Sequence, residues 1–349
     1  MDCPLGVVEM ITNSSTNDSF IPHAAGERYV LLAWTCACVI ISIPGNITVL
    51  AAVLVYNAIK LDRVSVILIC NLAVWDLIYT TIGILPTIPA LATEKWVFGT
   101  GLCCFQYWVI WLALLGDVTL VCSLNISKLT SLLFPLDARL RARRTGRYIA
   151  LCLWLGILLF SVPVALNAVR GEIRMNSGSY RCDSSSGHSA SLWWVPVYSV
   201  LFIIIPILLI IVTTVWLLWY VNKERGLQRQ SILTLILISG VFVLSYISVA
   251  AMLICYIFVD PGDPENTSFY DHFFKVSMFI NYVNYTLNPL VYYRSISSFN
   301  RFVKTKVFRV RPQITPQFSS TTSTNFRMKN SVRVPGPDRP VAVFYRNSG

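Results

Sequence analysis

Charged residues are scarce in this chain: Asp, Glu, Lys and Arg make up only 13% of its 349 residues. Soluble domains contain about 25%, so the composition argues against a soluble globular protein. Histidine is scarcer still, with three residues, His23, His188 and His272. The sequence contains no HExxH motif, no phosphate-binding P-loop and no Ser–His pair suited to nucleophilic catalysis. These absences exclude the usual residues of metalloproteases, NTPases and serine hydrolases.

Three further patterns are missing. Residues 1–28 lack the basic start and short apolar core of a cleavable signal peptide, so we expect the first apolar segment to direct insertion. No nucleic-acid-binding module accompanies the net charge of +11, so we expect no nucleic-acid partner. No internal repeat is detectable, which disfavours a transporter because many transporters are built from paired repeats.

Apolar residues, in contrast, are abundant and gathered in long blocks. They make up 55% of the chain, and its mean hydropathy is +0.62. Each block reaches the roughly 20 residues that a helix needs to cross about 30 Å of hydrocarbon. The seven blocks are residues 29–57, 64–92, 102–133, 147–169, 192–222, 231–259 and 272–293. The sequence therefore predicts an all-α membrane protein, with a bundle of seven transmembrane helices over residues 29–293.

Basic residues are unevenly distributed between the segments that join these blocks. The segments after the first, third, fifth and seventh blocks carry most of them, including five arginines within residues 139–147. Lys and Arg are retained on the cytoplasmic side of a membrane. We therefore expect a plasma-membrane protein with an extracellular N-terminal tail (1–28) and a cytoplasmic C-terminus. The arginine run is expected to form a basic cytoplasmic loop that meets anionic membrane lipid.

Cysteines and glycosylation sequons fit an oxidising exterior. The cysteines on the expected outside are Cys3, Cys103, Cys104 and Cys182. A disulfide between the start of the third block and the loop before the fifth would stabilise the outer surface. The spacing leaves open whether Cys103 or Cys104 pairs with Cys182, and whether Cys3 pairs with the remaining one. The external sequons are at Asn13, Asn17 and Asn266.

Short motifs recur in a fixed order along the seven blocks. They are Gly45-Asn46, NLAVWD at 71–76, WVFG at 96–99 ahead of Cys103, Trp154, Pro206 and NYTLNPLVYY at 284–293. In this order and spacing they resemble the rhodopsin-like (class A) G-protein-coupled receptors, over residues 29–308. The resemblance implies a receptor that passes an extracellular ligand signal to a heterotrimeric G protein, with no enzymatic activity and no organic cofactor. It also points to Cys103 as the partner of Cys182.

The third block ends in an unusual triplet. The family carries Asp-Arg-Tyr there, and counting back from Pro135-Leu136 places Ser127-Lys128-Leu129 on it. In the family, the arginine is held by its acidic neighbour at rest and released to contact the G protein. Here the positive charge remains but the adjacent acid is missing, and an ammonium group cannot copy the bidentate contacts of arginine. The alternative is that Lys128 only extends to the membrane interface.

Other switch positions also depart from the family. Its Cys-Trp-x-Pro stretch reads Ser245-Tyr246-Ile247-Ser248, and a tyrosine of the fifth span is replaced by Thr214. These changes imply weak or unusual coupling or an altered resting balance, and a signalling-deficient decoy or scaffold is the alternative function. The switch residues carried over by the resemblance are Ser127, Lys128, Leu129, Asn288, Pro289 and Tyr292.

Two acids lie within the apolar blocks, Asp76 and Asp117. Ionisable groups are costly inside a membrane, so they usually face the bundle interior and serve a function. The resemblance implies a sodium ion at Asp76, and two neighbouring carboxylates need a cation or a shared proton. The candidate sodium site is Asp76, Asp117, Asn46, Asn284 and Asn288. The alternatives are a hydrogen-bonded structural pair, a transporter, and an intramembrane aspartyl protease, whose Gly-x-Gly-Asp motif reads Leu-Leu-Gly-Asp at 114–117.

The outer half of the bundle is expected to form the ligand cavity. The candidate lining residues are Tyr107, Ile110, Trp111, Trp193, Trp194, Tyr246, Asn281 and Tyr282. For the two adjacent tryptophans, an interfacial aromatic belt is the alternative. Ile110 stands where aminergic receptors carry an aspartate, and Tyr282 where opsins carry the retinal-linking lysine. A loop at 170–187, with arginines and a turn at 176–178 that suits a hairpin, favours a peptide or another small non-aminergic ligand.

The chain after the seventh block divides into two parts. Residues 294–308 combine an apolar face with a basic one, which predicts a short amphipathic helix at the cytoplasmic membrane surface. Residues 309–349 are rich in Ser, Thr and Pro and are expected to be a disordered tail. The cluster SSTTST at 319–324 is a candidate phosphorylation site for an arrestin-type partner, and a plain solvated linker is the alternative.

Overall fold

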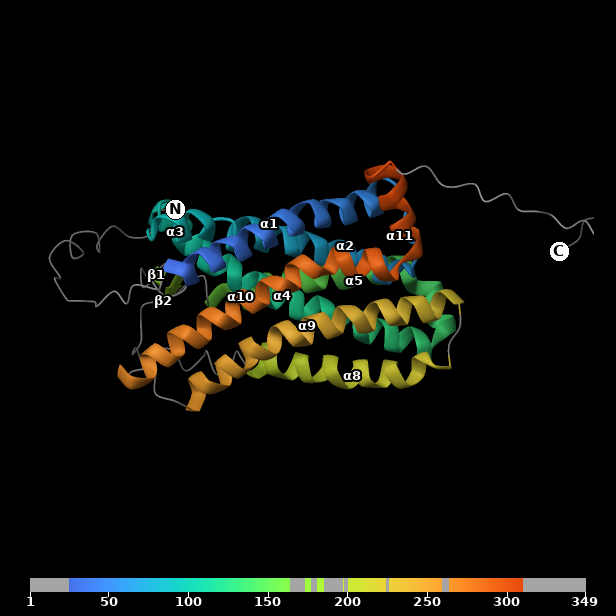
Figure 1. Cartoon of the computed structure of the whole chain (residues 1–349). Helices are drawn as coiled ribbons and strands as arrows, with labels where there is room; N and C mark the ends of the chain where they lie inside the picture. Colours follow the sequence, from blue (N-terminus) through green and yellow to red (C-terminus); the bar gives the residue numbers. More distant parts are fainter. Residues whose placement is uncertain are drawn as a thin grey trace, which may run out of the picture. The chain divides into compact units, whose positions relative to one another are not determined.

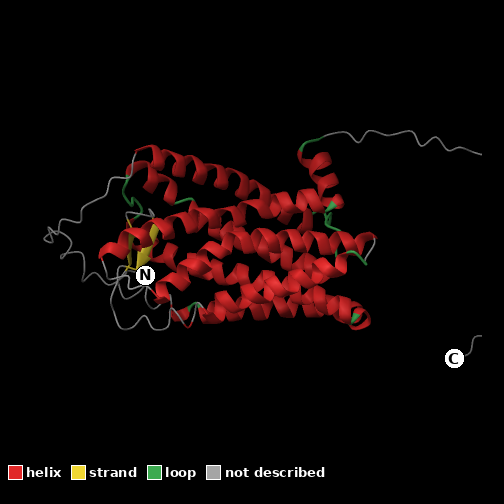
Figure 2. Ribbon diagram, turned by 60° about the horizontal axis from the view of Figure 1, so that its bottom comes forward, coloured by secondary structure: helices red, strands yellow, loops and turns green. Residues whose placement is uncertain are grey.

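The computed structural model describes residues 25–163, 173–176, 181–184, 197, 200–223, 226–258 and 264–309. Apart from one two-stranded hairpin, the regular structure of this part is helical. The long helices lie side by side (Figure 1, Figure 2). The main helices are α1 Ala25–Leu54, α2 Arg63–Ile78, α3 Thr87–Thr93, α4 Gly99–Leu133, α5 Pro135–Phe160, α8 Ile205–Val221, α9 Gly226–Phe258 and α10 Pro264–Ser295.

Each of the seven predicted apolar blocks contains a helix, which confirms the all-α prediction. Within the described residues, five helices are long and apolar enough to cross a membrane, and Gly146–Phe160 is a shorter apolar helix. The five are Gly26–Leu54, Arg63–Thr93, Gly99–Leu133, Val200–Val221 and Arg229–Ala251. The chain is therefore a helical membrane protein with several spans.

Helix α4 lies at the centre of the packing. It contacts α2, α5, α8, α9 and the two strands. In its most apolar stretch 78% of the residues are buried, compared with 28% for Val200–Val221. Polar and charged residues of α4 are consequently surrounded by other helices, whereas α8 presents most of its apolar residues outward, as lipid contact requires.

Helix α5 corrects one prediction. The arginine run at 139–147 was expected to be a loop, but α5 is helical from Pro135 onward. Proline is favoured at the first position of a helix because its missing N–H would have no partner there and its φ angle is already helical. The Leu, Ala and Arg residues that follow are strong helix formers, so the helix starts before the apolar block does.

Two π-helical segments interrupt the spans, η2 (Tyr79–Ile84) and η4 (Val200–Ile204). A proline follows two residues after the end of each segment, Pro86 after η2 and Pro206 after η4. A proline ring clashes with the carbonyl four residues earlier and offers no N–H to it. A wider turn in front of the proline relieves that clash, and such π segments often occur at functional sites.

The segment after α10 is helical but broken. Ile296 is extended (φ −104°, ψ 102°) and separates α10 from α11 (Ser297–Phe302), which continues into η5 (Val303–Val307). The predicted helix at 294–308 is thus present but starts three residues later. Phe302 packs against Tyr56 with ring centroids 5.0 Å apart, so this segment lies against the end of α1 (Figure 1).

The hairpin predicted at 170–187 is confirmed. Strands β1 (Ile173–Asn176) and β2 (Arg181–Ser184) pair antiparallel, with Asn176 opposite Arg181 and Met175 opposite Cys182. Both strands contact α4. Cys103 in the first turn of α4 is disulfide-bonded, so it is the paired member of the Cys103-Cys104 sequence. Its pairing with Cys182, whose side chain lies outside the described residues, stays a prediction.

Candidate functional site

The two intramembrane acids lie in one polar cluster at the middle of the bundle. Asp76 on α2 and Asp117 on α4 are both fully buried. Asn288 Nδ2 donates a hydrogen bond to Asp76 Oδ2 at 3.0 Å, and Asn284 Nδ2 donates to Asp117 Oδ2 at 3.1 Å. Tyr246 Oη on α9 also donates to Asp117 Oδ2, at 3.3 Å. Helices α2, α4, α9 and α10 therefore meet at these two carboxylates, which we call the acid pair.

Aromatic hydroxyls extend the acid pair along the bundle axis. Tyr246 and Tyr285 share a hydrogen bond between their hydroxyl groups at 3.1 Å. The Tyr285 ring stacks on Tyr79 with centroids 3.8 Å apart, and the Tyr246 ring stacks on Phe242 at 4.1 Å. A change in the rotamer of Tyr246 would therefore move a hydrogen bond to Asp117 and a hydroxyl contact to Tyr285 together.

Helix α1 joins the same cluster through amide and hydroxyl groups. Asn46 Nδ2 donates to the carbonyl oxygens of Ser42 and Tyr285, each at 3.1 Å. The Ser42 hydroxyl lies 2.7 Å from that of Thr80, which donates to the Asp76 carbonyl at 2.6 Å. The amide group of Asn46 is thereby fixed in orientation between α1 and α10.

Several oxygens in this cluster remain available to a cation. Among the residues that the structure describes, four buried oxygens of the predicted sodium site have no hydrogen-bond partner: Asn46 Oδ1, Asp76 Oδ1, Asp117 Oδ1 and Asn288 Oδ1. A buried oxygen without a partner is costly, and carboxylate and amide oxygens suit a hard cation. The donor set therefore fits sodium. Within the described part of the chain, no three His, Cys, Asp or Glu residues lie together in a group that could hold a transition-metal ion.

An aromatic stack supports the acid pair from the side of α5. The rings of Trp75 and Trp154 stack with centroids 4.3 Å apart, and Trp154 Nε1 donates to Asn71 Oδ1 at 2.7 Å. A Cβ atom on Gly116 would lie 2.8 Å from the Trp75 ring. Glycine at this position lets α4 approach the indole closely, directly next to Asp117.

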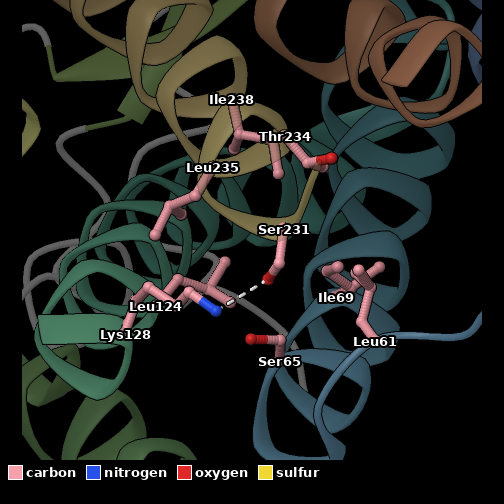
Figure 3. Close-up of a pocket in the computed structure, with 9 residues that line it drawn as sticks. All are labelled: Leu61, Ser65, Ile69, Leu124, Lys128, Ser231, Thr234, Leu235 and Ile238. Carbon is pink, nitrogen blue, oxygen red and sulfur yellow. Dashed lines mark hydrogen bonds between the residues drawn. The ribbon is translucent and has the colours of Figure 1, made fainter. Parts of the chain in front are cut away.

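A second polar cluster lies at the end of the bundle where α2 begins and α4 ends (Figure 3). Lys128 is only 6% exposed, and its Nζ donates to Ser231 Oγ on α9 at 3.0 Å. Asp62 Oδ2 lies 3.9 Å from the same Nζ. The idea that Lys128 only extends to the membrane interface is wrong, because the ammonium is enclosed between helices. The acid missing from position 127 is replaced in space by Asp62.

The position of Asp62 is fixed by a second role. It is the N-cap of α2, accepting hydrogen bonds from Ser65 N at 2.9 Å and Ser65 Oγ at 2.8 Å. An N-cap aspartate satisfies a backbone N–H that the first helical turn leaves without a partner. Capping therefore holds the carboxylate where it faces Lys128.

The predicted ligand residues fall into two groups. Tyr107 and Ile110 are buried near the start of α4, where Tyr107 and Trp111 form an edge-to-face ring pair with centroids 6.5 Å apart. Tyr246 instead belongs to the acid pair cluster, and Tyr282 contacts Tyr79 (6.3 Å) and Phe279 (5.2 Å). Within the described structure, the amide atoms of Asn281 are buried without a hydrogen-bond partner.

Several predicted sites lie outside the described residues. They are Trp193, Trp194, Asn13, Asn17, the side chain of Asn266 and the tail beyond 309. Of the predicted switch residues, Tyr292 and Asn288 are buried, and Pro289 packs against Gly45, whose added Cβ would lie 2.9 Å from Pro289 Cγ.

Four residues of the acid pair cluster were missed from sequence: Ser42, Tyr79, Thr80 and Tyr285. A signal for them existed, because Thr80 is four residues after Asp76, Tyr285 is three before Asn288, and Ser42 is four before Asn46. Residues three or four apart share a helix face, so polar neighbours at that spacing from each predicted ligand could have been included.

Comparisons with known proteins agree with this architecture. A model of the family described as "7 transmembrane receptor (rhodopsin family)" matches residues 45–292. Proteinase-activated receptor 1 of Xenopus laevis is 21% identical over 307 residues, covering 79% of this chain and 68% of the relative. Lysophosphatidic acid receptor 6 of Mus musculus is 23% identical over 346 residues (90% and 95%). A purinoceptor of Cavia porcellus is 24% identical over 250 residues (66% and 65%).

Proposed function

Because this chain belongs to the rhodopsin family of seven-transmembrane receptors, we propose that it passes the signal of a specific extracellular ligand to a heterotrimeric G protein. It is a receptor, not an enzyme. The aspartyl protease and transporter alternatives are therefore set aside. We further propose seven membrane spans, with the N-terminus outside, residues 294–308 at the cytoplasmic surface and the tail as an arrestin contact.

The observation that carries the proposal is the hydrogen-bonded path through the bundle. Tyr246 on α9 donates to Asp117 on α4, and Asp117 in turn accepts from Asn284 on α10. Four residues further along α10, Asn288 binds Asp76 on α2. A ligand that shifts Tyr246 would thereby alter contacts of three other helices. Such a shared polar element is a physical means of coupling two ends of a bundle.

For the ligand, we propose a peptide or another small molecule without a biogenic amine. The position of the amine-binding aspartate is Ile110, buried and apolar, which gives no counter-charge to an amine. Relatives include receptors named for proteinase activation, lysophosphatidic acid, purines and C-X-C chemokines. None of these names is that of a biogenic amine, which supports the same choice.

For the acid pair, we propose a sodium site that stabilises the resting state. Asp76 and Asp117 would supply carboxylate oxygens, and Asn46 and Asn288 amide oxygens, all of which are buried without partners within the described structure. Asn284 would keep Asp117 in place through its 3.1 Å hydrogen bond. When bound, the ion supplies a positive charge that compensates the two carboxylates.

A ligand screen tests the proposed function. Cells expressing the full chain are exposed to panels of peptides, lysophospholipids and nucleotides, with G-protein activation and arrestin recruitment measured in parallel. The expected result is a response to at least one compound that is lost in Tyr246→Ala but retained in Thr130→Ala. Thr130 is exposed and its hydroxyl binds the Ile126 carbonyl of its own helix. Silence in every channel with normal surface expression would instead support a decoy or scaffold.

A further inference from the structure

One face of α8 carries a continuous stripe of exposed apolar side chains. Leu208, Val212 and Val215 are 55%, 65% and 60% exposed, and Trp219 is 61% exposed. Their spacings of four, three and four residues place them on one side of the helix. Helices α4 and α9 pack against α8 (Figure 1) but leave this side uncovered. We call these four residues the α8 stripe.

The length of the α8 stripe matches one leaflet of a membrane. Trp219 follows Leu208 by eleven residues (219 minus 208), which at 1.5 Å per residue is about 16 Å. Half of a hydrocarbon layer of roughly 30 Å is about 15 Å. With Trp219 at the boundary between hydrocarbon and headgroups, where tryptophan is enriched, the stripe therefore extends across the acyl layer of a single leaflet.

A lysine follows the stripe at the depth of the headgroups. Lys223 Nζ lies 3.9 Å from the centroid of the Trp219 ring, whose face attracts an ammonium group. The backbone N–H of Lys223 donates to the Tyr220 carbonyl at 3.0 Å, so the turn that ends α8 fixes where this side chain begins. Among the residues that the structure describes, no carboxylate lies within ion-pair distance of Lys223. A ring face cannot satisfy the three N–H donors of an ammonium, so Lys223 can still bind an anion.

The surroundings of Lys223 add aromatic surface and a second positive charge. Trp216 and Tyr220 stack with ring centroids 5.1 Å apart and an angle of 13° between the rings. They lie in the last two turns of α8, beside Trp219. Arg229, near the beginning of α9, is exposed, and α8 ends where α9 begins, at the same end of the bundle. This end of the two helices is therefore both aromatic and basic.

We propose that the α8 stripe and Lys223 bind one anionic phospholipid of the cytoplasmic leaflet, with phosphatidylserine as the test ligand. An acyl chain lies along the stripe, and the lipid phosphate accepts hydrogen bonds from the Lys223 ammonium, which the Trp219 ring holds at headgroup depth. Phosphatidylcholine fits the stripe equally well, but its choline group already compensates its phosphate. The choice of leaflet rests on the proposed orientation of the chain, whereas the binding itself does not depend on the proposed receptor function.

Lipid binding to the purified full chain tests this site. The chain in detergent micelles is titrated with phosphatidylserine or with phosphatidylcholine, and native mass spectrometry counts the lipids that stay bound. The unaltered chain should retain phosphatidylserine in preference to phosphatidylcholine. Lys223→Gln should lower the affinity for phosphatidylserine about fivefold, the usual contribution of one lysine to anionic-lipid binding. Lys223→Arg should keep the affinity, and neither substitution should alter the binding of phosphatidylcholine.

Two further variants separate the site from net charge. Lys60→Gln is the same chemical change at another exposed lysine, and no cation–π contact of the described residues involves Lys60. It should leave the affinity for phosphatidylserine nearly unchanged. Trp219→Leu keeps the apolar stripe and the Lys223 charge but removes the ring face, so the affinity should fall about twofold.

Three results would overturn the lipid site. The first is equal retention of the two lipids by the unaltered chain. The second is an equal loss of affinity in Lys223→Gln and Lys60→Gln, because only net charge would then matter. The third is unchanged phosphatidylserine binding in Lys223→Gln together with reduced G-protein activation, because this surface would then contact a protein. A chain that responds to no compound, yet binds phosphatidylserine through Lys223, would count against the proposed function and support the lipid site.

Discussion

Asp76 and Asp117 lie in the middle of the bundle, where their described hydrogen-bond partners are asparagine and tyrosine side chains. Lys128 lies at its end, where the described contacts give it both a carboxylate and a serine hydroxyl. Asp76, Asp117 and Lys128 are all buried, and both clusters join helices that are distant in sequence. The acid pair has two groups of one sign, whereas the cluster of Asp62, Lys128 and Ser231 has charges of opposite sign.

This difference determines what each cluster can respond to. Two neighbouring carboxylates in a dry environment need a cation or a shared proton, so the acid pair is sensitive to the ions around it. An ammonium that already faces a carboxylate has its counter-charge within the protein, so the cluster around Lys128 does not need an added ion. The four predictions below test the contrast, from the largest expected effect to the smallest.

Gly116→Ala should have the largest effect on stability, because Gly116 is next to Asp117 of the acid pair and faces the Trp75 ring. The new Cβ would lie 2.8 Å from two atoms of the Trp75 ring, and overpacking of this kind costs about 1–3 kcal/mol. Thermal unfolding in nanodiscs should show a clear loss of stability. Gly156→Ala is the control, since the described structure places nothing within 4 Å of that Cβ. Equal stability of the two variants would show that α4 does not need its close approach to Trp75.

Sodium should stabilise the unaltered chain, by about 1 kcal/mol when the ion is at several times its dissociation constant. Melting temperatures measured in sodium chloride and in choline chloride at equal ionic strength give the difference. Asp117→Asn should remove it, because one of the two carboxylates is lost. Lys128→Met should keep it, since Lys128 is not part of the predicted sodium site. A sodium effect that persists in Asp117→Asn would contradict the site.

Tyr246→Phe should lower stability by about 1 kcal/mol, the usual value of a buried hydrogen bond, because the hydroxyl contacts both Asp117 and Tyr285. Tyr292→Phe is the same chemical change at a buried hydroxyl for which the described residues provide no hydrogen-bond partner. It should be neutral or stabilising. The thermal unfolding of the two variants is compared directly, and a reversed order would argue against the hydrogen-bonded path.

Asp62 and Lys128 should show a small coupling in a double-mutant cycle. Since Asp62 is partly exposed, the coupling between Asp62→Asn and Lys128→Met should be about 0.5 kcal/mol, measured by thermal unfolding. Additive effects of the two substitutions would mean that the ion pair contributes nothing to stability.

The sequence predicted the helices well and the interhelical contacts less well. Apolar block length located a helix at all seven positions, because burial in lipid imposes a simple length rule. The helical start of α5 at Pro135 was missed, because charged residues hide a helix from a hydropathy criterion. Motif order predicted one site for Asp76, Asp117, Asn284 and Asn288, and the structure gives the hydrogen bonds Asn288–Asp76 and Asn284–Asp117. Asn284 and Asn288 are four residues apart and therefore share a face of α10.

Contacts between distant segments could not be predicted in this way. The missing acid beside Lys128 suggested an unbalanced charge, but Asp62 is 66 positions earlier in the chain (128 minus 62), and only the packing of α2 against α4 places it there. Tyr285 was passed over for a similar reason. Its spacing of three residues from Asn288 indicated its helix face, but its contact with Tyr246 depends on how α9 and α10 lie together, which no local pattern contains.

The π-helical segment η2 has a consequence for any numbering scheme based on motifs. A π turn accommodates one more residue than an α turn, so everything beyond Ile84 is offset by about 100° around the helix axis relative to an uninterrupted α-helix. Counting forward from NLAVWD with an uninterrupted α-helical period therefore places Thr87, Ala90 and Leu91 on the wrong face of the helix. All three are buried.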